Sequence, residues 1–114
     1  MPSARSRKMT DRKLLWIARE FREGILDDRK SSEGMCFAVC AALVGYLKFI
    51  GINAEMIESD LSDRPGEWQN HFWLKLSDAR ALDPTADQFD DLSLPPVYLG
   101  PAIPAIHVLT GGNT

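Results

Sequence analysis

The chain has 114 residues, of which 45% are hydrophobic and 25% are charged. These values are typical of one soluble globular domain, and they exclude collagen, a coiled coil and a largely disordered chain. No apolar run approaches the ~20 residues that a bilayer span needs, and the N-terminus lacks the apolar centre of a secretory signal. We therefore expect a cytoplasmic protein with no membrane partner.

The net charge of −3 is unevenly distributed along the chain. Five of the first 13 residues are basic and one is acidic, whereas the remainder is acidic. We expect residues 1–9 to form a flexible basic arm and residues 10–114 to form a single domain. Outside the arm, basic residues do not form a stripe interleaved with aromatic residues, so we expect no nucleic-acid partner.

Two helices are predicted first. Thr10 can cap a helix that runs to about Asp28 with apolar residues at helical spacing, and 27–34 is a polar connector. A second helix is expected to begin near Ser32 to Gly34 and to end at Gly51, because glycine suits a helix C-terminus. The second helix is apolar nearly all round, which predicts a central helix buried on most sides.

Strands follow the helices. Residues 52–59, 68–76 and 80–85 read as strands, and a further edge strand is expected near 106–109 in an otherwise irregular, proline-rich tail. Helices followed by strands predict an α+β domain with a small, mainly antiparallel sheet.

The hairpin between the second and third strands has a predictable register. A three-residue loop at 77–79 pairs Leu74 with Leu82 and sets Trp73 opposite Asp83. His71 then lies diagonal to Asp83 on the same face, within side-chain reach.

Cys36 is the candidate nucleophile. It falls in the first turn of the second predicted helix, where the helix dipole and the free N–H groups favour a thiolate. Cys40 is one turn deeper and is interpreted as packing beneath the site. A disulfide between the two is not expected, because helical geometry holds such a pair too far apart. A thiolate nucleophile needs an imidazole partner and a group that orients the imidazole, and His71 and Asp83 fit these roles.

Three sequence blocks in this order resemble the transglutaminase-like superfamily, a branch of the papain-like thiol enzymes. The blocks are GMCFAVCAAL, NHFWLKL and ALDPTADQF, which lie within residues 34–89, about half of the chain. The resemblance implies a papain-like core in which Cys36 is the nucleophile, His71 the base and acid, and Asp83 the residue that orients His71. It also implies acyl transfer through a thioester, with a peptide or a glutamine side chain as the amide substrate.

The chain departs from that family in two ways. It is far shorter than eukaryotic transglutaminases, and nothing in it resembles their calcium-binding regions. The glutamine that completes the oxyanion hole of papain-like proteases has no clear counterpart upstream of Cys36. The Cys36 backbone N–H could serve, with Gln69 or Asn70 as side-chain donors. Gly34 would let substrate approach closely, and Trp73 would shield the imidazole or contact substrate.

Other interpretations remain open. Each cysteine could simply pack in the core. A zinc site from Cys36, Cys40, His71 and His107 is conceivable, but Cys-x3-Cys within a helix matches structural zinc sites poorly, so we expect no metal and no cofactor. The absent oxyanion glutamine leaves a non-catalytic binding module on the same scaffold as the alternative function.

Overall fold

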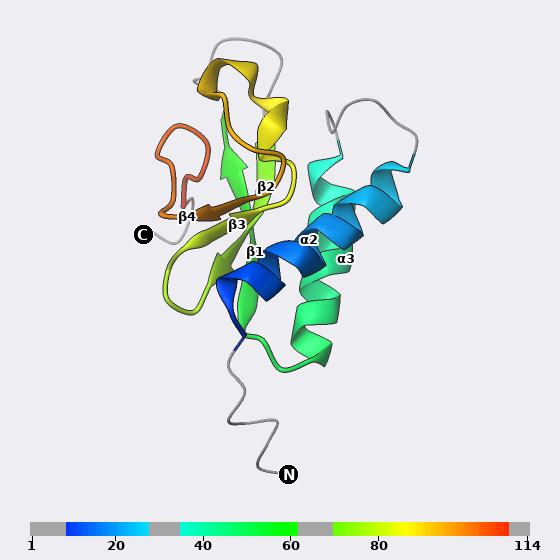
Figure 1. Ribbon diagram of the computed structural model, residues 1–114. Helices are drawn as coiled ribbons and strands as arrows, with labels where there is room; N and C mark the ends of the chain where they lie inside the picture. Colours follow the sequence, from blue (N-terminus) through cyan, green and yellow to red (C-terminus); the bar gives the residue numbers. More distant parts are fainter. Residues whose placement is uncertain (1–8, 28–34, 62–69, 110–114) are drawn as a thin grey trace.

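The computed structural model describes residues 9–27, 35–61 and 70–109. Two helices precede a four-stranded antiparallel sheet of order β1-β2-β3-β4, which confirms the α+β prediction. Both helices lie on the same side of the sheet (Figure 1). The elements are α2 (Asp11–Leu26), α3 (Cys36–Phe49), β1 (Ala54–Asp60), β2 (Asn70–Leu76), β3 (Ala81–Asp83), the 3-10 helices η1 (Ala86–Gln88) and η2 (Asp90–Leu92), and β4 (Tyr98–Gly100).

The outer boundaries of the helices follow from local capping. Thr10 Oγ1 accepts a hydrogen bond from the Lys13 backbone N–H at 3.1 Å, so the predicted N-cap of α2 is confirmed. At the end of α3, Gly51 adopts a φ of 87° and donates to Lys48 O, while Ile52 N–H donates to Leu47 O. This pair of bonds is the Schellman arrangement, which glycine permits because it has no Cβ. Most of the predicted connector (28–34) and most of the predicted N-terminal arm (1–8) lie outside the described residues.

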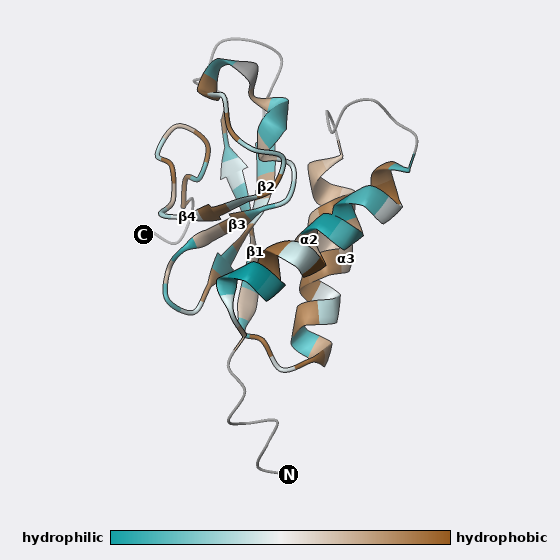
Figure 2. Cartoon of the chain, viewed as in Figure 1, coloured by the Kyte–Doolittle hydropathy of each residue, from teal (hydrophilic) through white to brown (hydrophobic). Residues whose placement is uncertain are grey.

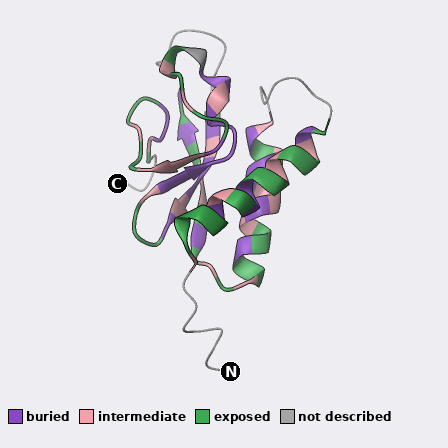
Figure 3. Ribbon diagram, viewed as in Figure 1, coloured by how far each residue is buried: buried purple, intermediate pink, exposed green. Residues whose placement is uncertain are grey.

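The expectation that α3 is buried on most sides was wrong. One stripe of the helix, from Cys36 through Val39, Cys40 and Leu43 to Leu47, is buried against the sheet and α2. The opposite side is exposed although it is apolar, and Phe49 is 86% exposed. Figure 2 shows brown, hydrophobic residues along much of α3, and Figure 3 shows exposed green segments on both helices. Two covering layers are too few to enclose a helix completely in a domain of this size.

No helix in the described part of the chain is long and apolar enough to cross a bilayer.

The β2–β3 hairpin has the predicted register. Leu74 pairs with Leu82, and Leu76 N–H donates to Arg80 O, which leaves a three-residue loop. Ala79 ends that loop with a φ of 75°. By the alternation of side chains along a strand, Leu74 faces the helices while Trp73 and His71 face the other way. The hairpin therefore separates the main core from the polar side chains of the candidate site.

The fourth strand differs from the prediction. The sheet ends with β4 at Tyr98–Gly100, and 106–109 is not a strand. Val97 and Tyr98 are good strand formers, and the prolines on either side are tolerated because β4 lies at the edge. The segment that was expected to form a strand turns instead, with Ile106 N–H and His107 N–H both donating to Ile103 O. Ile106 and Val108 of this segment join a second core cluster, which also contains Leu61 and Phe89.

Candidate active site at the start of helix α3

Cys36 lies where the β2–β3 ladder stops. Alternate residues of β2 direct their backbone groups toward β3, and by this register Phe72 would pair with residue 84. That residue is Pro84, which has no N–H and cannot continue the ladder. The first turn of α3 fills the vacated place: the Phe72 N–H bonds to the Cys36 sulfur, and the Cys40 thiol donates to Phe72 O at 3.4 Å.

His71 connects the thiol to a carboxylate. Its Nε2 lies 2.7 Å from Asp83 Oδ2, and its ring also makes a hydrogen bond with Cys36. Because Nε2 is occupied by Asp83, the thiol interaction falls to Nδ1, which it shares with the Gln88 side-chain amide 3.2 Å away. Phe89 packs edge-on against the imidazole at 4.7 Å between ring centroids. The three predicted triad residues are therefore joined in the predicted order, with His71 and Asp83 fully buried.

The electrostatics favour a thiolate–imidazolium pair. Burial alone would raise the pKa of Cys36, but its bonds to His71 and to the Phe72 N–H, together with the charge on His71, hold the pKa below its ordinary value. Burial alone would lower the pKa of His71, yet Asp83 and Cys36 raise it to about 9. Burial alone would raise the pKa of Asp83, but its hydrogen bonds to His107 and His71, together with the charge interactions with both rings, hold the pKa below the usual range.

Cys40 has a different environment. Burial raises its pKa well above the ordinary thiol value, and the charges on Asp83 and Cys36 raise it further. Its side chain is fully buried in the main core, and both cysteines are free thiols. Its predicted role as packing beneath the site is confirmed, and it is a matched control for Cys36 because the two lie one turn apart.

The predicted substrate and oxyanion residues have other partners or lie outside the described chain. The Trp73 indole N–H donates to Ser59 Oγ at 2.8 Å, and the ring is 1% exposed, so Trp73 offers no donor to a substrate. The Asn70 side-chain amide donates to the Glu58 carboxylate on β1. Gly34 and Gln69 fall in the undescribed segments.

Gln88 is a site residue that the sequence reasoning missed. It lies on η1, one short turn after Asp83, and is 6% exposed. Its Nε2 is 3.2 Å from His71 Nδ1 and 3.1 Å from Thr85 Oγ1, and it also makes a hydrogen bond with the Cys36 sulfur. The block ALDPTADQF contains it, but only the tertiary fold reveals that its amide turns toward the thiol.

An arginine from α2 fixes η1 in place. The Arg22 guanidinium makes two hydrogen bonds to the Asp87 carboxylate, at 2.8 and 2.9 Å. The same guanidinium donates to Pro84 O and Pro96 O, at 3.1 and 3.3 Å. A planar fork is suited to such bidentate contacts. Arg22 thus satisfies the Pro84 carbonyl that the interrupted ladder leaves unpaired, and holds the turn that carries Gln88.

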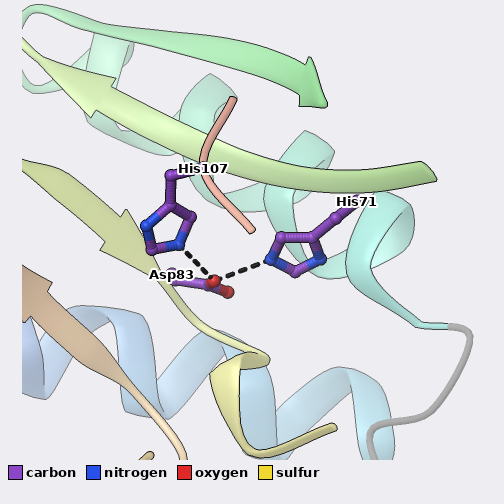
Figure 4. Close-up of side chains that lie close together, drawn as sticks. All are labelled: His71, Asp83 and His107. Carbon is purple, nitrogen blue, oxygen red and sulfur yellow. Dashed lines mark hydrogen bonds and ion pairs between the residues drawn. The ribbon is translucent and has the colours of Figure 1, made fainter. Parts of the chain in front are cut away.

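His107 is the second residue whose place was missed. It reaches the site from the C-terminal segment, and its Nε2 lies 2.8 Å from Asp83 Oδ2. Figure 4 shows Asp83 between the two imidazoles, which come from separate segments of the chain. Asp83 Oδ1 accepts a further hydrogen bond, from the Thr85 N–H at 3.2 Å. From the sequence, His107 is expected in an edge strand near 106–109 and is considered for a conceivable zinc site, but it is not placed beside Asp83.

His71, Asp83 and His107 also form a possible metal-ligand group, since their ligand atoms lie within 4.8 Å of one another. The hydrogen bonds argue against that use. The Ile103 backbone N–H donates to His107 Nδ1 at 2.8 Å, which places the ring proton on Nε2. A metal ion bound at Nε2 would leave the ring proton on Nδ1. That proton would face the Ile103 N–H, and two donors cannot form a hydrogen bond with each other. The cluster is therefore better described as a hydrogen-bonded network than as a metal centre.

The arrangement can perform nucleophilic chemistry. A thiol with a lowered pKa is hydrogen-bonded to an imidazole whose other nitrogen contacts a buried carboxylate, and an amide donor lies beside the sulfur. Comparisons of the chain with models of protein families, with curated proteins and with solved structures found no match. What this site does must therefore be inferred from its sequence pattern and its geometry.

Proposed function

We propose that this protein is a small thiol-dependent acyl-transfer enzyme on a papain-like, transglutaminase-like core. The observation that carries the proposal is the continuous chain from Cys36 through His71 to Asp83, built at the N-terminus of α3. A core cysteine needs no imidazole, and a core histidine needs no thiol. Here a cysteine, a histidine and an aspartate contact one another in sequence, and each comes from one of the three blocks that resemble the transglutaminase-like superfamily. This combination favours catalysis.

The first half of the reaction forms a thioester. The Cys36 thiolate attacks the carbonyl carbon of an amide, so that a C–S bond forms and the carbonyl electrons move onto oxygen. His71 Nδ1–H gives its proton to the leaving nitrogen as the C–N bond breaks. Asp83 remains ionised and holds Nε2, as its lowered pKa favours.

The second half releases the acyl group. Water or an amine loses a proton to His71 Nδ1 as it attacks the thioester, and the C–S bond breaks to restore the thiolate. Hydrolysis, deamidation and transfer to an amine differ only in the leaving group and the acceptor. From the resemblance to the transglutaminase-like superfamily, we propose that the substrate is an amide of a peptide or of a glutamine side chain.

The developing oxyanion needs hydrogen-bond donors. The first N–H groups of a helix have no intrahelical acceptor, and the first α3 bond is from Val39 N–H to Met35 O. The Cys36 N–H therefore points out of the helix end, and Gln88 brings a second donor to the sulfur. Each oxyanion donor of this type contributes on the order of 10²–10³ in rate.

A binding module without turnover is the second candidate. The observation that favours it is the closure of the site: Cys36 is 9% exposed, and His71 and Asp83 are not exposed at all. A substrate carbonyl must reach the sulfur, whereas a binding partner need only contact the rim.

Acylation by an activated ester separates the two candidates. The full chain is mixed with p-nitrophenyl acetate, quenched in acid, and analysed by intact mass and peptide mapping. We expect one acetyl group on Cys36 in the wild type and in Cys40→Ser, and none in Cys36→Ser. Adding a glutamine peptide with or without a primary amine then distinguishes ammonia release from amine incorporation. Wild-type protein that gains no acetyl group on Cys36 beyond the Cys36→Ser background would refute acyl transfer and favour the binding module.

A further inference from the structure

His107 has no part in the acyl-transfer steps, yet it is among the most buried polar residues of the described chain. Its side chain is fully enclosed, and its Nε2 shares Asp83 Oδ2 with His71. The contact joins the C-terminal segment to the end of β3, 24 residues apart in sequence. A buried imidazole that contacts the carboxylate of the site is placed to act on it.

The backbone fixes which nitrogen of His107 carries the proton. A backbone N–H can only donate, and the Ile103 N–H points at His107 Nδ1 over 2.8 Å. Nδ1 must therefore accept, and the ring proton lies on Nε2. The turn that makes this contact is closed by His107 N–H donating to Ile103 O at 2.7 Å. His107 is consequently a preset donor toward Asp83.

The segment that carries His107 is anchored to β1 through Ser59. The Ser59 hydroxyl donates to Val108 O at 2.6 Å and accepts from Val108 N–H at 2.7 Å. The same oxygen accepts from the Trp73 indole N–H at 2.8 Å, and the Trp73 ring packs on His107 at 4.8 Å. The residue after His107 is thus held at both backbone atoms, so the donor cannot easily leave Asp83.

We propose that His107 is a positioning residue for the thiol site: its preset Nε2–H fixes the Asp83 carboxylate and keeps Cys36 a thiolate to lower pH. The proposal rests on the proposed function, since it assigns His107 to the same nucleophile. His107 is bonded to Asp83 and not to the nucleophile itself, so it acts through Asp83 and His71.

The sign of the effect follows from the charges that face the network. Thiolate, imidazolium and carboxylate sum to one negative charge at Cys36, His71 and Asp83. In the described chain, the groups around the His107 ring are Asp83 on β3, His71 and Trp73 on β2, and the phenol ring of Tyr98 on β4. A neutral N–H donor directed at an anionic network stabilises its unprotonated form. Removing the donor therefore makes the network easier to protonate, and the thiolate is lost at higher pH.

The test compares His107→Phe, which has no donor, with His107→Gln, which keeps a side-chain N–H donor. The rate of Cys36 alkylation by iodoacetamide is measured across the acid range on the full chain, and near-ultraviolet circular dichroism confirms folding. We expect the acid midpoint of His107→Phe to rise by about one pH unit or more, because a hydrogen bond to a buried charge is worth that much. We expect His107→Gln to stay close to the wild-type midpoint.

A purely structural role predicts another pattern, in which both variants lower the melting temperature and neither moves the midpoint. An unmoved midpoint in folded His107→Phe overturns the proposal. If that variant does not fold, the NMR resonances of the His107 ring nitrogens in the wild-type protein test the proposal instead. They must show a protonated Nε2 and an unprotonated Nδ1, and the opposite tautomer overturns the proposal. The alkylation assay needs no acyl substrate, so it is independent of the acylation assay. If Cys36 is alkylated but never acylated, the proposed acyl transfer fails, while the role of His107 is still tested by the alkylation midpoint.

Discussion

Replacing Asp83 by asparagine removes one charge and exchanges one oxygen for an amide nitrogen. Three donors point at the Asp83 carboxylate: His71 Nε2, His107 Nε2 and the Thr85 backbone N–H. Oδ2 of the carboxylate accepts from both histidines and Oδ1 accepts from Thr85, whereas an asparagine side chain has an acceptor oxygen in only one of these two places. The new amide nitrogen is itself a donor. With its oxygen kept toward the histidines, Asp83→Asn leaves the Thr85 N–H facing the new amide nitrogen; with its oxygen turned to Thr85, it leaves both histidines without an acceptor.

The cost in stability can be worked out from this geometry. A buried donor that loses its partner costs about 1–3 kcal/mol, so the substitution costs about 1–3 kcal/mol when the amide oxygen stays with the histidines and about 2–6 kcal/mol when it faces Thr85. A domain of this kind has an unfolding free energy of about 5–15 kcal/mol. The substitution should thus be among the more damaging single changes in the chain although it alters almost no volume.

The same substitution should disable the nucleophile. After burial, Asp83 is the largest influence on His71 and is the main reason that the pKa of His71 rises from 6.5 to about 9. Without the carboxylate, burial dominates and the pKa of His71 falls, so His71 no longer holds the Cys36 proton. Each unit of lost pKa corresponds to about a tenfold smaller ion-pair population. We expect alkylation of Cys36 near neutral pH to slow by about ten- to a hundredfold.

Urea denaturation followed by tryptophan fluorescence gives the stability change, and iodoacetamide labelling at pH 7 gives the reactivity. Asp78→Asn is the matched control, because Asp78 is an exposed aspartate in the hairpin loop whose side chain contacts Arg80. It should leave the labelling rate unchanged. An Asp83→Asn protein with wild-type stability and a wild-type labelling rate would refute this account of the network.

Three further substitutions or conditions test other parts of the site. Arg22→Lys cannot keep both bonds to Asp87, so we expect a loss of about 1 kcal/mol in urea denaturation and slower acylation of Cys36; unchanged values would mean that Arg22 does not hold η1. Gln88→Leu removes the side-chain donor beside the sulfur, so acylation should slow by about 10²-fold while alkylation, which forms no oxyanion, changes far less; equal slowing of both would assign Gln88 to the thiolate alone. Because the folded pKa of Asp83 is lowered, its contribution to stability is full above its unfolded pKa of about 3.9 and is lost as the pH falls through the folded pKa. The urea midpoint should therefore drop on acidification below about pH 4, and a slope identical in Asp83→Asn would contradict that assignment.

Short-range rules predicted much of the framework. Thr10 and Gly51 marked helix boundaries because capping depends on a few neighbouring residues. The hairpin register followed from loop length and side-chain alternation, and it led from Leu74 and Leu82 to the placement of His71 beside Asp83. In each case, the interaction that decides the structure lies close by in the sequence.

Long-range contacts supplied the rest. His107 meets Asp83 from a segment that Ser59 anchors at Val108, and no periodic pattern in the tail signals that contact. Gln88 turns toward the thiol because a 3-10 helix follows β3, and short turns of this kind leave little trace in composition. Apolar patterning also overestimated the burial of α3, because it reports the residues available for a core and not the number of layers that cover them.

The reactivity of Cys36 relative to Cys40 is the most direct test of the central claim. Both thiols belong to the same helix, so unfolding or a change of reagent affects them alike, while the pKa is lowered in Cys36 and raised in Cys40. Limiting iodoacetamide at pH 6 to 7, followed by peptide mapping, should label Cys36 far faster than Cys40, and His71→Ala should greatly slow the labelling of Cys36 while Cys40, which is fully buried, stays slow. Equally slow labelling of both cysteines in the folded wild-type protein would contradict a thiolate nucleophile at this site.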